Sequence, residues 1–251
     1  MTALKRCLLL LALAVSMSAA GCSAGRLSRS SSDRGIEAAS RGTLAPVYAP
    51  LAEHLVSKFD LGDKEGIGID LGSGPGTLIL ELCRRTEMHW INADINPDFF
   101  PRFFARASEL GLGGRVSAVF ADAHALPFHD NYADIIVSRG SFHFWRDKTQ
   151  GFREIYRVLK PGSVAYIGRG FSKNLPVETA REIRAKQGKR MKYDVDEMAE
   201  ELRRVMAALE IETFKIHRPN PPASENVNYG IWVEFHKPEG DTGEKQSREH
   251  H

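Results

Sequence analysis

The sequence predicts an α/β fold with a doubly wound, mostly parallel sheet of seven strands. A buried strand pattern over residues 67–71 runs straight into a turn with three glycines, and four further short apolar runs alternate with helical segments. Strands that alternate with helices favour a parallel sheet with crossover helices. Two strand patterns near the end of the chain have no helix between them, so this last pair is expected to be antiparallel.

Length and charge limit the classes of function. The chain has 251 residues, which is enough for one α/β domain with a sizeable core and too few for two full domains with tails. Lysine and arginine total 34 against 32 acidic residues, so the net electric field is weak. Because no basic stripe is present, we expect no nucleic-acid partner.

The first 22 residues resemble a bacterial lipoprotein signal peptide. Lys5 and Arg6 precede an apolar run over residues 7–20, and small residues then lead to Cys22, which would carry the lipid after cleavage. The run of 14 residues suits a signal. It is shorter than the about 20 residues that a membrane-spanning helix needs.

We therefore expect a lipoprotein anchored to the membrane, although Ala19 stands where such signals usually have leucine. An uncleaved anchor and a misassigned start are the alternatives, and a chain without a working signal would be cytoplasmic. The segment 23–41 is rich in serine, arginine and glycine, which is typical of a flexible linker. The domain is expected over 42–238, followed by a charged, disordered tail over 239–251.

The three cysteines supply neither a disulfide framework nor a metal cluster. Cys7 lies inside the predicted signal, and Cys22 is the predicted lipidation site. Cys83 is left alone in a helical segment and is expected to be a small apolar core residue. We therefore expect no metal site.

Within the domain, residues 44–59 have apolar side chains near helical spacing, and Pro46 and Pro50 predict a short or broken helix there. A second helical pattern, 152–159, is expected to stop at Pro161 and Gly162. Five central strands are predicted at 67–71, 90–93, 116–120, 135–137 and 164–167.

The last third of the domain predicts one helix and the terminal strand pair. Asp194, with Glu197 three residues later, is typical of a helix N-terminus. Strands are predicted at 211–216 and 229–235, and the second of them alternates apolar and polar residues.

The glycine turn after the first strand is the leading candidate for a ligand site. Gly72, Gly74 and Gly76 let a ligand approach the backbone, because they have no Cβ. The dinucleotide fingerprint would need a glycine at Thr77, which disfavours a nicotinamide cofactor. An ordinary strand-to-helix turn is the alternative.

Two carboxylates follow the next two strands. Asp94, at the end of the second strand, can accept hydrogen bonds from both hydroxyls of a ribose, or it can cap the helix that begins near Pro97. Asp122 follows the third strand and can accept from the exocyclic amine of an adenine, while the backbone of Ala123 could meet the ring edge. A surface aspartate in a loop is the alternative for Asp122.

These residues together resemble the class I methyltransferases that depend on S-adenosyl-L-methionine (SAM), whose fold is Rossmann-like. The match runs through the family's first motif, its ribose acid and its adenine contact: Asp70, Gly72, Gly74 and Gly76, then Asp94, then Asp122 with Ala123. By the same resemblance we assign Ser73, Ile95 and Ser138 to the cofactor site. Asp134 and the segment 157–162 match later parts of the family pattern, and the resemblance covers residues 44–236.

The acceptor of the methyl group is expected near the segment that follows the fourth strand. His143 could remove a proton near neutral pH, and Arg139 could hold a carboxylate or phosphate. Phe142, Phe144 and Trp145, together with Tyr48, could form aromatic walls around the acceptor. The alternative is structural: Phe142 and Trp145 in the core, His143 a packing residue and Arg139 a loop anchor.

The segment 168–188 could form a lid over the site, and it begins with Arg169, Gly170 and Phe171. Its basic residues are expected to form a solvated helix face, or else to contact an acidic acceptor or a membrane headgroup. These residues are Arg181, Arg184, Lys186, Lys189, Arg190 and Lys192.

The resemblance implies a SAM-dependent methyltransferase that acts on a small molecule by in-line transfer, since no extra domain for a protein or nucleic acid is visible. SAM is made in the cytosol, whereas a lipoprotein signal directs a domain out of it. An exported module that binds SAM or a nucleoside without catalysis is therefore the alternative function, and a nucleotide-dependent oxidoreductase is a more distant one.

Overall fold

The computed structural model describes residue 35 and residues 38–187 and 193–240. The predicted signal peptide with Cys22, most of the predicted linker, residues 188–192 and the tail from residue 241 lie outside the described residues. Residues 38–41 are helical and Ser40 is buried. The folded part therefore begins before residue 42, where the sequence had predicted its start.

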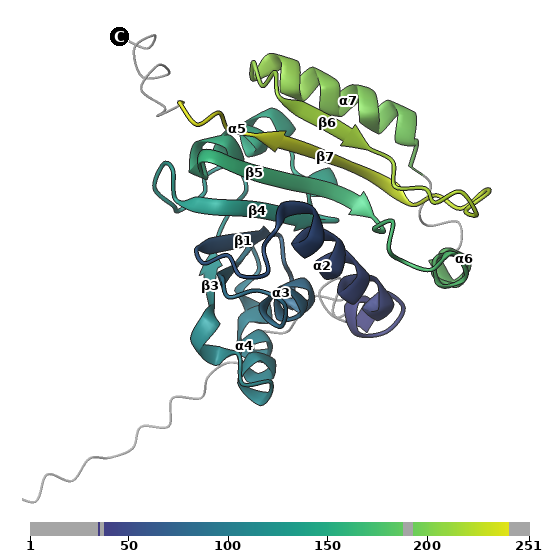
Figure 1. Cartoon of the computed structure of the whole chain (residues 1–251), viewed down its shortest axis with the longest axis horizontal. Coiled ribbons are helices and arrows are strands. Elements are labelled where there is room, and N and C mark those ends of the chain that lie inside the picture. Colours follow the sequence, from purple (N-terminus) through teal and green to yellow (C-terminus); the bar gives the residue numbers. More distant parts are fainter. Residues whose placement is uncertain (1–34, 36–37, 188–192, 241–251) are drawn as a thin grey trace, which may run out of the picture.

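A seven-stranded sheet forms the centre of the molecule, in the order β3-β2-β1-β4-β5-β7-β6. All pairs among the first five strands in this order are parallel, and β7 is antiparallel to both of its neighbours. The arrowheads of β5 and β7 accordingly point in opposite directions in Figure 1. The predicted fold class and the antiparallel terminal pair are confirmed. The strands are Ile67–Leu71 (β1), His89–Asp94 (β2), Val116–Phe120 (β3), Ala133–Arg139 (β4), Leu159–Gly170 (β5), Phe214–His217 (β6) and Gly230–His236 (β7).

Helices cover both faces of this sheet, which gives three layers. One apolar cluster joins the sheet to α2, α3 and α4, and a second joins it to α5 and α7. The helix α6 packs in a third cluster with Val47, Phe171 and Tyr229, and Figure 1 shows it beyond the arrowhead of β5. The helices are Ala45–Phe59 (α2), Thr77–Cys83 (α3), Phe100–Glu109 (α4), Lys148–Val158 (α5), Val177–Gln187 (α6) and Val195–Ala208 (α7), with short 3-10 turns at Pro97–Phe99, Gly113–Arg115 and Phe142–Phe144.

Several elements differ from their predicted form. The helix α2 is continuous over 15 residues despite Pro50. Pro46 lies in its first turn, where a missing N–H costs nothing, and the carbonyl of Pro50 accepts a hydrogen bond from Ser172 Oγ at 3.0 Å. Pro161 and Gly162 do not follow the helix α5 but lie inside the strand β5. The connection from β3 to β4, residues 121–132, contains no helix.

Two other predictions are confirmed. The Asp194 carboxylate caps α7 by accepting from the backbone N–H groups of Asp196 and Glu197 at 2.7 and 3.2 Å. Cys83 is a free, buried cysteine, and burial raises the pKa of its thiol to about 12. None of the helices within the described ranges combines the length and apolar character that crossing a bilayer requires.

The strand β7 is buried on both faces, although its alternating sequence resembles a half-exposed strand. Ile231, Val233 and Phe235 join the cluster under α5 and α7, while Trp232 stacks on Tyr166 on the opposite face with ring centres 4.9 Å apart. Its central position between β5 and β6 explains this burial.

Glu234 of β7 is a buried carboxylate with three partners. Its oxygens lie 2.9 Å from Lys58 Nζ of α2, 2.6 Å from His217 Nε2 of β6 and 3.2 Å from His236 Nε2. Burial alone would raise the pKa of Glu234, but the hydrogen bonds from His217, Lys58 and His236 outweigh it and hold the pKa well below its usual range. The cluster therefore attaches α2 to the terminal strands.

We expect Glu234→Gln to lower the free energy of unfolding by about 2 kcal/mol near neutral pH, because charged hydrogen bonds are lost. The wild-type stabilisation exists above the pKa of an unfolded glutamate, about 4.3, and decreases as the pH falls towards the folded-state value. In urea unfolding, the difference in the free energy of unfolding between the wild type and Glu234→Gln should therefore become smaller below about pH 4. The exposed Glu212 provides a control, since Glu212→Gln should leave stability unchanged. An equal difference in the free energy of unfolding at neutral and at acid pH would contradict this explanation.

Candidate functional site

A cavity of about 1040 Å³ opens at the carboxyl ends of the central strands. It lies where the strand order reverses, between β1 with its glycine turn and β4 with the loop that follows. Such switch points are where ligands bind in open α/β sheets. Its lining has an acidic part, formed by Asp70, Asp94 and Asp122, and a part with aromatic and basic side chains. The two parts adjoin, because Arg139 acts on the pKa of Asp70 and Arg146 on that of Asp122.

The glycine turn owes its shape to residues that tolerate a left-handed backbone. Gly72, Gly74 and Gly76 have φ values of 70°, 55° and 71°. A Cβ on Gly72 would lie 2.3 Å from Ser141 Cβ, and one on Gly76 would lie 2.2 Å from the Phe103 ring. Gly72 and Gly74 line the cavity, whereas Gly76 lies outside its lining and permits close packing of α3 on α4.

Asp94 holds this turn from the neighbouring strand. Its Oδ2 accepts from the backbone N–H of Gly74 at 2.7 Å, and its Oδ1 accepts from that of Asn96 at 2.8 Å. The carbonyl of Gly74 accepts in turn from Asn92 Nδ2 at 3.0 Å. The residue that caps the following 3-10 turn is Asn96, whose side chain accepts from Asp98 N–H. Asp94 is therefore not that cap.

Asp70 is a buried carboxyl group beside the turn, with a hydrogen bond from Ser73 Oγ at 2.6 Å. Burial raises the pKa of Asp70 to about 7 against the opposing effect of this bond, and the nearby Asp94 raises it further. Two acids thus lie close together at the floor of the cavity.

Asp122 has one occupied and one available oxygen in this arrangement. Its Oδ1 accepts from the backbone N–H of His124 at 3.0 Å and lies 2.6 Å from His124 Nδ1. His124 Nε2 accepts from Asp147 N–H at 3.2 Å, which assigns the ring proton to Nδ1. The bonds from the His124 backbone and ring lower the pKa of Asp122. Ala123 is buried beside it, and Ile95 lines the same cavity with 60% of its surface exposed.

Besides Gly76, two other sequence-predicted site residues lie outside the cavity lining. Ser138, predicted as a cofactor residue, is fully buried and donates to the carbonyl of Leu71 at 2.7 Å. Phe142, predicted as a substrate residue, is fully buried in the core with Trp145 and Phe152. Both therefore stabilise the joint between β1, β4 and the following loop, because their side chains point into the protein.

The other predicted acceptor residues line the aromatic and basic part of the cavity. Phe144 is 73% exposed, Trp145 is largely buried, and the ring centres of His143 and Phe144 lie 4.0 Å apart. Burial, followed by the charges of Arg169 and Lys148, lowers the pKa of His143 to about 4. The imidazole is therefore neutral at physiological pH.

Arg139 and Tyr48 face each other in this part of the cavity, with the guanidinium carbon 5.3 Å from the ring centre. Arg139 Nε donates to the carbonyl of Gly170 at 3.2 Å, which fixes the side chain across the ends of β4 and β5. Burial raises the pKa of Tyr48 although Arg139 opposes this shift.

Among the described residues, four arginines line the cavity, and sequence reasoning named all of them except Arg146. Arg184, for which a solvated face and contact with an acidic acceptor were both open, lines the cavity and lies on the same side of α6 as the buried Ala180 and Ile183. Arg169, at the start of the predicted lid, lies next to the last residue of β5, and Arg139 ends β4. Arg181, in contrast, is exposed and pairs with Glu178 at 2.7 Å, as a solvated face predicts.

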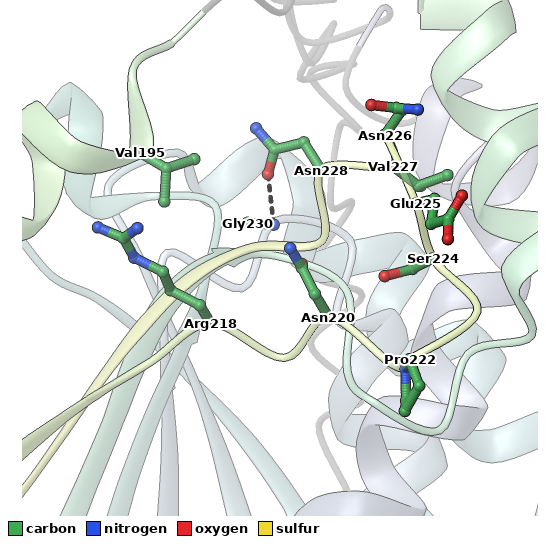
Figure 2. A pocket seen from close by; sticks show the side chains of 10 residues that line it. All are labelled: Val195, Arg218, Asn220, Pro222, Ser224, Glu225, Asn226, Val227, Asn228 and Gly230. Atoms are coloured by element: carbon green, nitrogen blue, oxygen red, sulfur yellow. Dashed lines mark hydrogen bonds between the residues drawn. The ribbon is translucent and has the colours of Figure 1, made fainter.

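A second hollow, of about 500 Å³, lies in the connection between β6 and β7 (Figure 2). Its polar side chains bond to the surrounding chain: Asn228 Oδ1 accepts from Gly230 N–H at 2.7 Å, Asn220 Oδ1 accepts from Tyr229 N–H at 3.2 Å, and Arg218 pairs with Asp196. These bonds shape the connection itself. The larger cavity at the strand ends is therefore the candidate site.

A model of the methyltransferase domain matches residues 69–167, which include the glycine turn and the ends of β1 to β4. A solved structure from Methanococcus maripaludis, assigned as an S-adenosyl-L-methionine-dependent methyltransferase, is 31% identical with a TM-score of 0.70. The similarity covers 82% of this chain and 92% of that one. The chain belongs to the SAM-dependent methyltransferases. A methyltransferase of Aquifex aeolicus, 18% identical with a TM-score of 0.59 over 81% of this chain and 96% of its own, shares the fold.

Relatives in quinone synthesis match the methyltransferase over a shorter stretch. The 2-methyl-6-phytyl-1,4-hydroquinone methyltransferase of Spinacia oleracea is 35% identical over 106 residues, 42% of this chain and 30% of that protein. The ubiquinone/menaquinone biosynthesis C-methyltransferase of Vibrio vulnificus is 38% identical over 96 residues, 38% of this chain and 37% of that protein. The chain thus spans less than two fifths of the length of these curated relatives.

SAM is the cofactor of this family, and the acidic part of the cavity fits it. The turn has glycines where it lines the cavity, Asp94 and Asp122 supply acceptors after β2 and β3, and the exposed Ile95 adds an apolar side chain to the lining. These groups match a sugar with two hydroxyls and an aromatic base with an amine.

Proposed function

We propose that this methyltransferase transfers the methyl group of SAM to a small-molecule acceptor by in-line displacement within the cavity described above. The observation that carries this proposal is that a single cavity, of about 1040 Å³, is lined both by the carboxylates Asp70, Asp94 and Asp122 and by aromatic and basic side chains. In this proposal the cofactor lies against the acids and the acceptor against the aromatic and basic residues.

In this proposal each acidic residue binds one part of the cofactor. The Asp94 carboxylate, already oriented by Gly74 and Asn96, accepts from the ribose hydroxyls. The free oxygen of Asp122 accepts from the adenine amine, and Ile95 covers the ring face. When bound, SAM supplies an electrophilic methyl group on a positively charged sulfur.

In the aromatic and basic part of the cavity the side chains orient the acceptor and exclude water. Phe144 and Trp145 form apolar walls, and the uncharged His143 can accept a proton from the acceptor atom that is methylated. Positioning supplies most of the rate in such a transfer. The names of the quinone-synthesis relatives support a planar ring as acceptor, which suits aromatic walls.

The direct test incubates the full chain with methyl-labelled SAM and a small-molecule cell extract, followed by mass spectrometry. We expect SAM to bind and a labelled product to form. Failure of SAM to bind would overturn the proposal. Binding without a labelled product would instead support the alternative function, a non-catalytic module.

Asp94→Ala should weaken SAM binding more than tenfold in calorimetric titration, since ribose hydroxyls lose their acceptor. The variant also removes the hydrogen bond from Gly74 N–H that holds the glycine turn. The control ligand is therefore an S-adenosylhomocysteine analogue without the two ribose hydroxyls, which separates loss of the ribose contact from a change in the turn. The variant should bind S-adenosylhomocysteine much more weakly than the wild type does, and the two proteins should differ little for the analogue. An equal loss for both ligands would show that Asp94 acts only on the turn.

His143→Ala should lower kcat by about a hundredfold or more while the SAM dissociation constant stays unchanged. Because the pKa of His143 is about 4, wild-type activity should persist at mildly acidic pH, where an ordinary histidine would be protonated. His129→Ala, at an exposed histidine, is the matched control. An unchanged kcat in His143→Ala would show that His143 only packs against its neighbours and does not act as a base.

We further propose that residues 1–22 act as a lipoprotein signal and that Cys22 carries the lipid, in which case the exported enzyme depends on SAM supplied outside the cytosol. The basic residues, the apolar run and the small residues before the cysteine support this. Cells fed with labelled palmitate should label the wild type and not Cys22→Ser. If neither protein carries label and both fractionate with the cytosol, the proposal fails.

A further inference from the structure

Three of the four described arginines that line the cavity come from different elements and lie near one another, since Arg139 acts on the pKa of both Arg169 and Arg184. Arg139 ends β4, Arg169 lies near the end of β5, and Arg184 comes from the inner side of α6, and all three line the cavity. Figure 1 shows α6 beyond the arrowhead of β5, and the cavity lies at this edge of the sheet, where the parallel strands end. The three arginines are far apart in the sequence, and the fold brings them to the same cavity.

Their surroundings orient these guanidinium groups. Arg184 Nε donates to the carbonyl of Asn228 at 2.8 Å, its Nη1 donates to Gln187 at 2.9 Å, and its guanidinium lies 4.2 Å from the ring centre of Phe171. The guanidinium of Arg169 lies at the same distance, 4.2 Å, from the ring centre of Tyr193. Carbonyl, amide and ring contacts hold the planar group of Arg184 without neutralising its charge.

Gathering the three cations has an electrostatic cost. Burial lowers the pKa values of Arg169 and Arg184, and Arg139 lowers both further by its charge. The same charges, Arg169 and Arg139, act on His143. Asp70 faces Arg139, but its own pKa of about 7 leaves it only partly ionised near neutral pH. Like charges that lie together in a cavity are stabilised when an anion binds among them.

We propose that the acceptor of the methyltransferase carries a carboxylate or phosphate group, and that Arg169 and Arg184, with Arg139 beside them, bind it. This inference rests on the proposed function, because the arginines line the part of the cavity assigned to the acceptor. Arginine presents a planar fork of donors that matches the oxygens of either anion. The acids in the cofactor part and the cations in the acceptor part would then orient the acceptor in one direction only.

The carboxylate of SAM itself is another anion that one guanidinium could bind. That binding would involve Arg139, which is the arginine that shifts the pKa of Asp70 beside the glycine turn. Arg169 and Arg184 lie against the rings of Tyr193 and Phe171. Substitution of Arg169 therefore separates the two roles.

The test measures binding of small aromatic probes to the full chain saturated with S-adenosylhomocysteine. The probes are 4-hydroxybenzoate and phenyl phosphate, and 4-hydroxybenzamide is the uncharged control of the same shape. We expect the wild type to bind at least one anion more than tenfold more tightly than the amide. The stronger of the two anions identifies carboxylate or phosphate as the preferred group.

In Arg169→Gln the preference for the anion should fall by about tenfold, with SAM affinity unchanged within twofold. Arg169→Lys keeps the charge and should retain part of the preference, which provides a second variant if the first does not fold. Arg181→Gln, on the exposed side of α6, is the matched control and should behave as the wild type.

Equal affinity of the wild type for the amide and both anions would overturn the inference, as would the absence of binding by all three probes. A loss of SAM affinity in Arg169→Gln would assign the arginine to the cofactor and would overturn it too. Failure of the proposed function is distinguishable, because it is measured by SAM binding and label transfer and not by the probes.

Discussion

The carboxylate of Asp94 is the contact on which the site depends. Its two oxygens accept backbone N–H groups from Gly74 in one loop and Asn96 in another, so a single side chain at the end of β2 fixes the turn that follows β1. A glycine-rich turn is flexible by composition and would not hold one shape by itself. The neighbouring strand provides the rigidity that the turn lacks.

The rest of the site follows from the position in the sheet where the strand order reverses, between β1 and β4. Strands β1 and β4 lie side by side, and the carbonyl of Leu71 accepts from both Ser138 and Ser141 where the loops diverge. The loops on either side of this joint line one cavity. Its acids come from β1, β2 and the loop after β3, and the three neighbouring arginines Arg139, Arg169 and Arg184 come from β4, β5 and α6.

The sequence predicted the sheet and the acidic part of the cavity well, because both depend on local signals. Apolar runs locate the strands, and Asp94 follows from its position after a strand. Ser138 and Phe142 could not be assigned in this way, since whether a side chain at a strand end faces the ligand or the core depends on the packing of the neighbouring loop. The place of Arg184 stayed open for a related reason: a helix rich in charged residues resembles a solvated one until its buried side is known.

The antiparallel strand β7 also determines when the fold can be completed. Within the described sheet β6 has β7 as its neighbour, and β5 presents an open edge until β7 pairs with it. A ribosome that has not yet released residues up to His236 therefore holds a chain whose sheet is incomplete and whose apolar surfaces for α7 are unformed. The packing of α6 against Tyr229 and of α7 against Ile231, Val233 and Phe235 is therefore completed only once β7 has been synthesised.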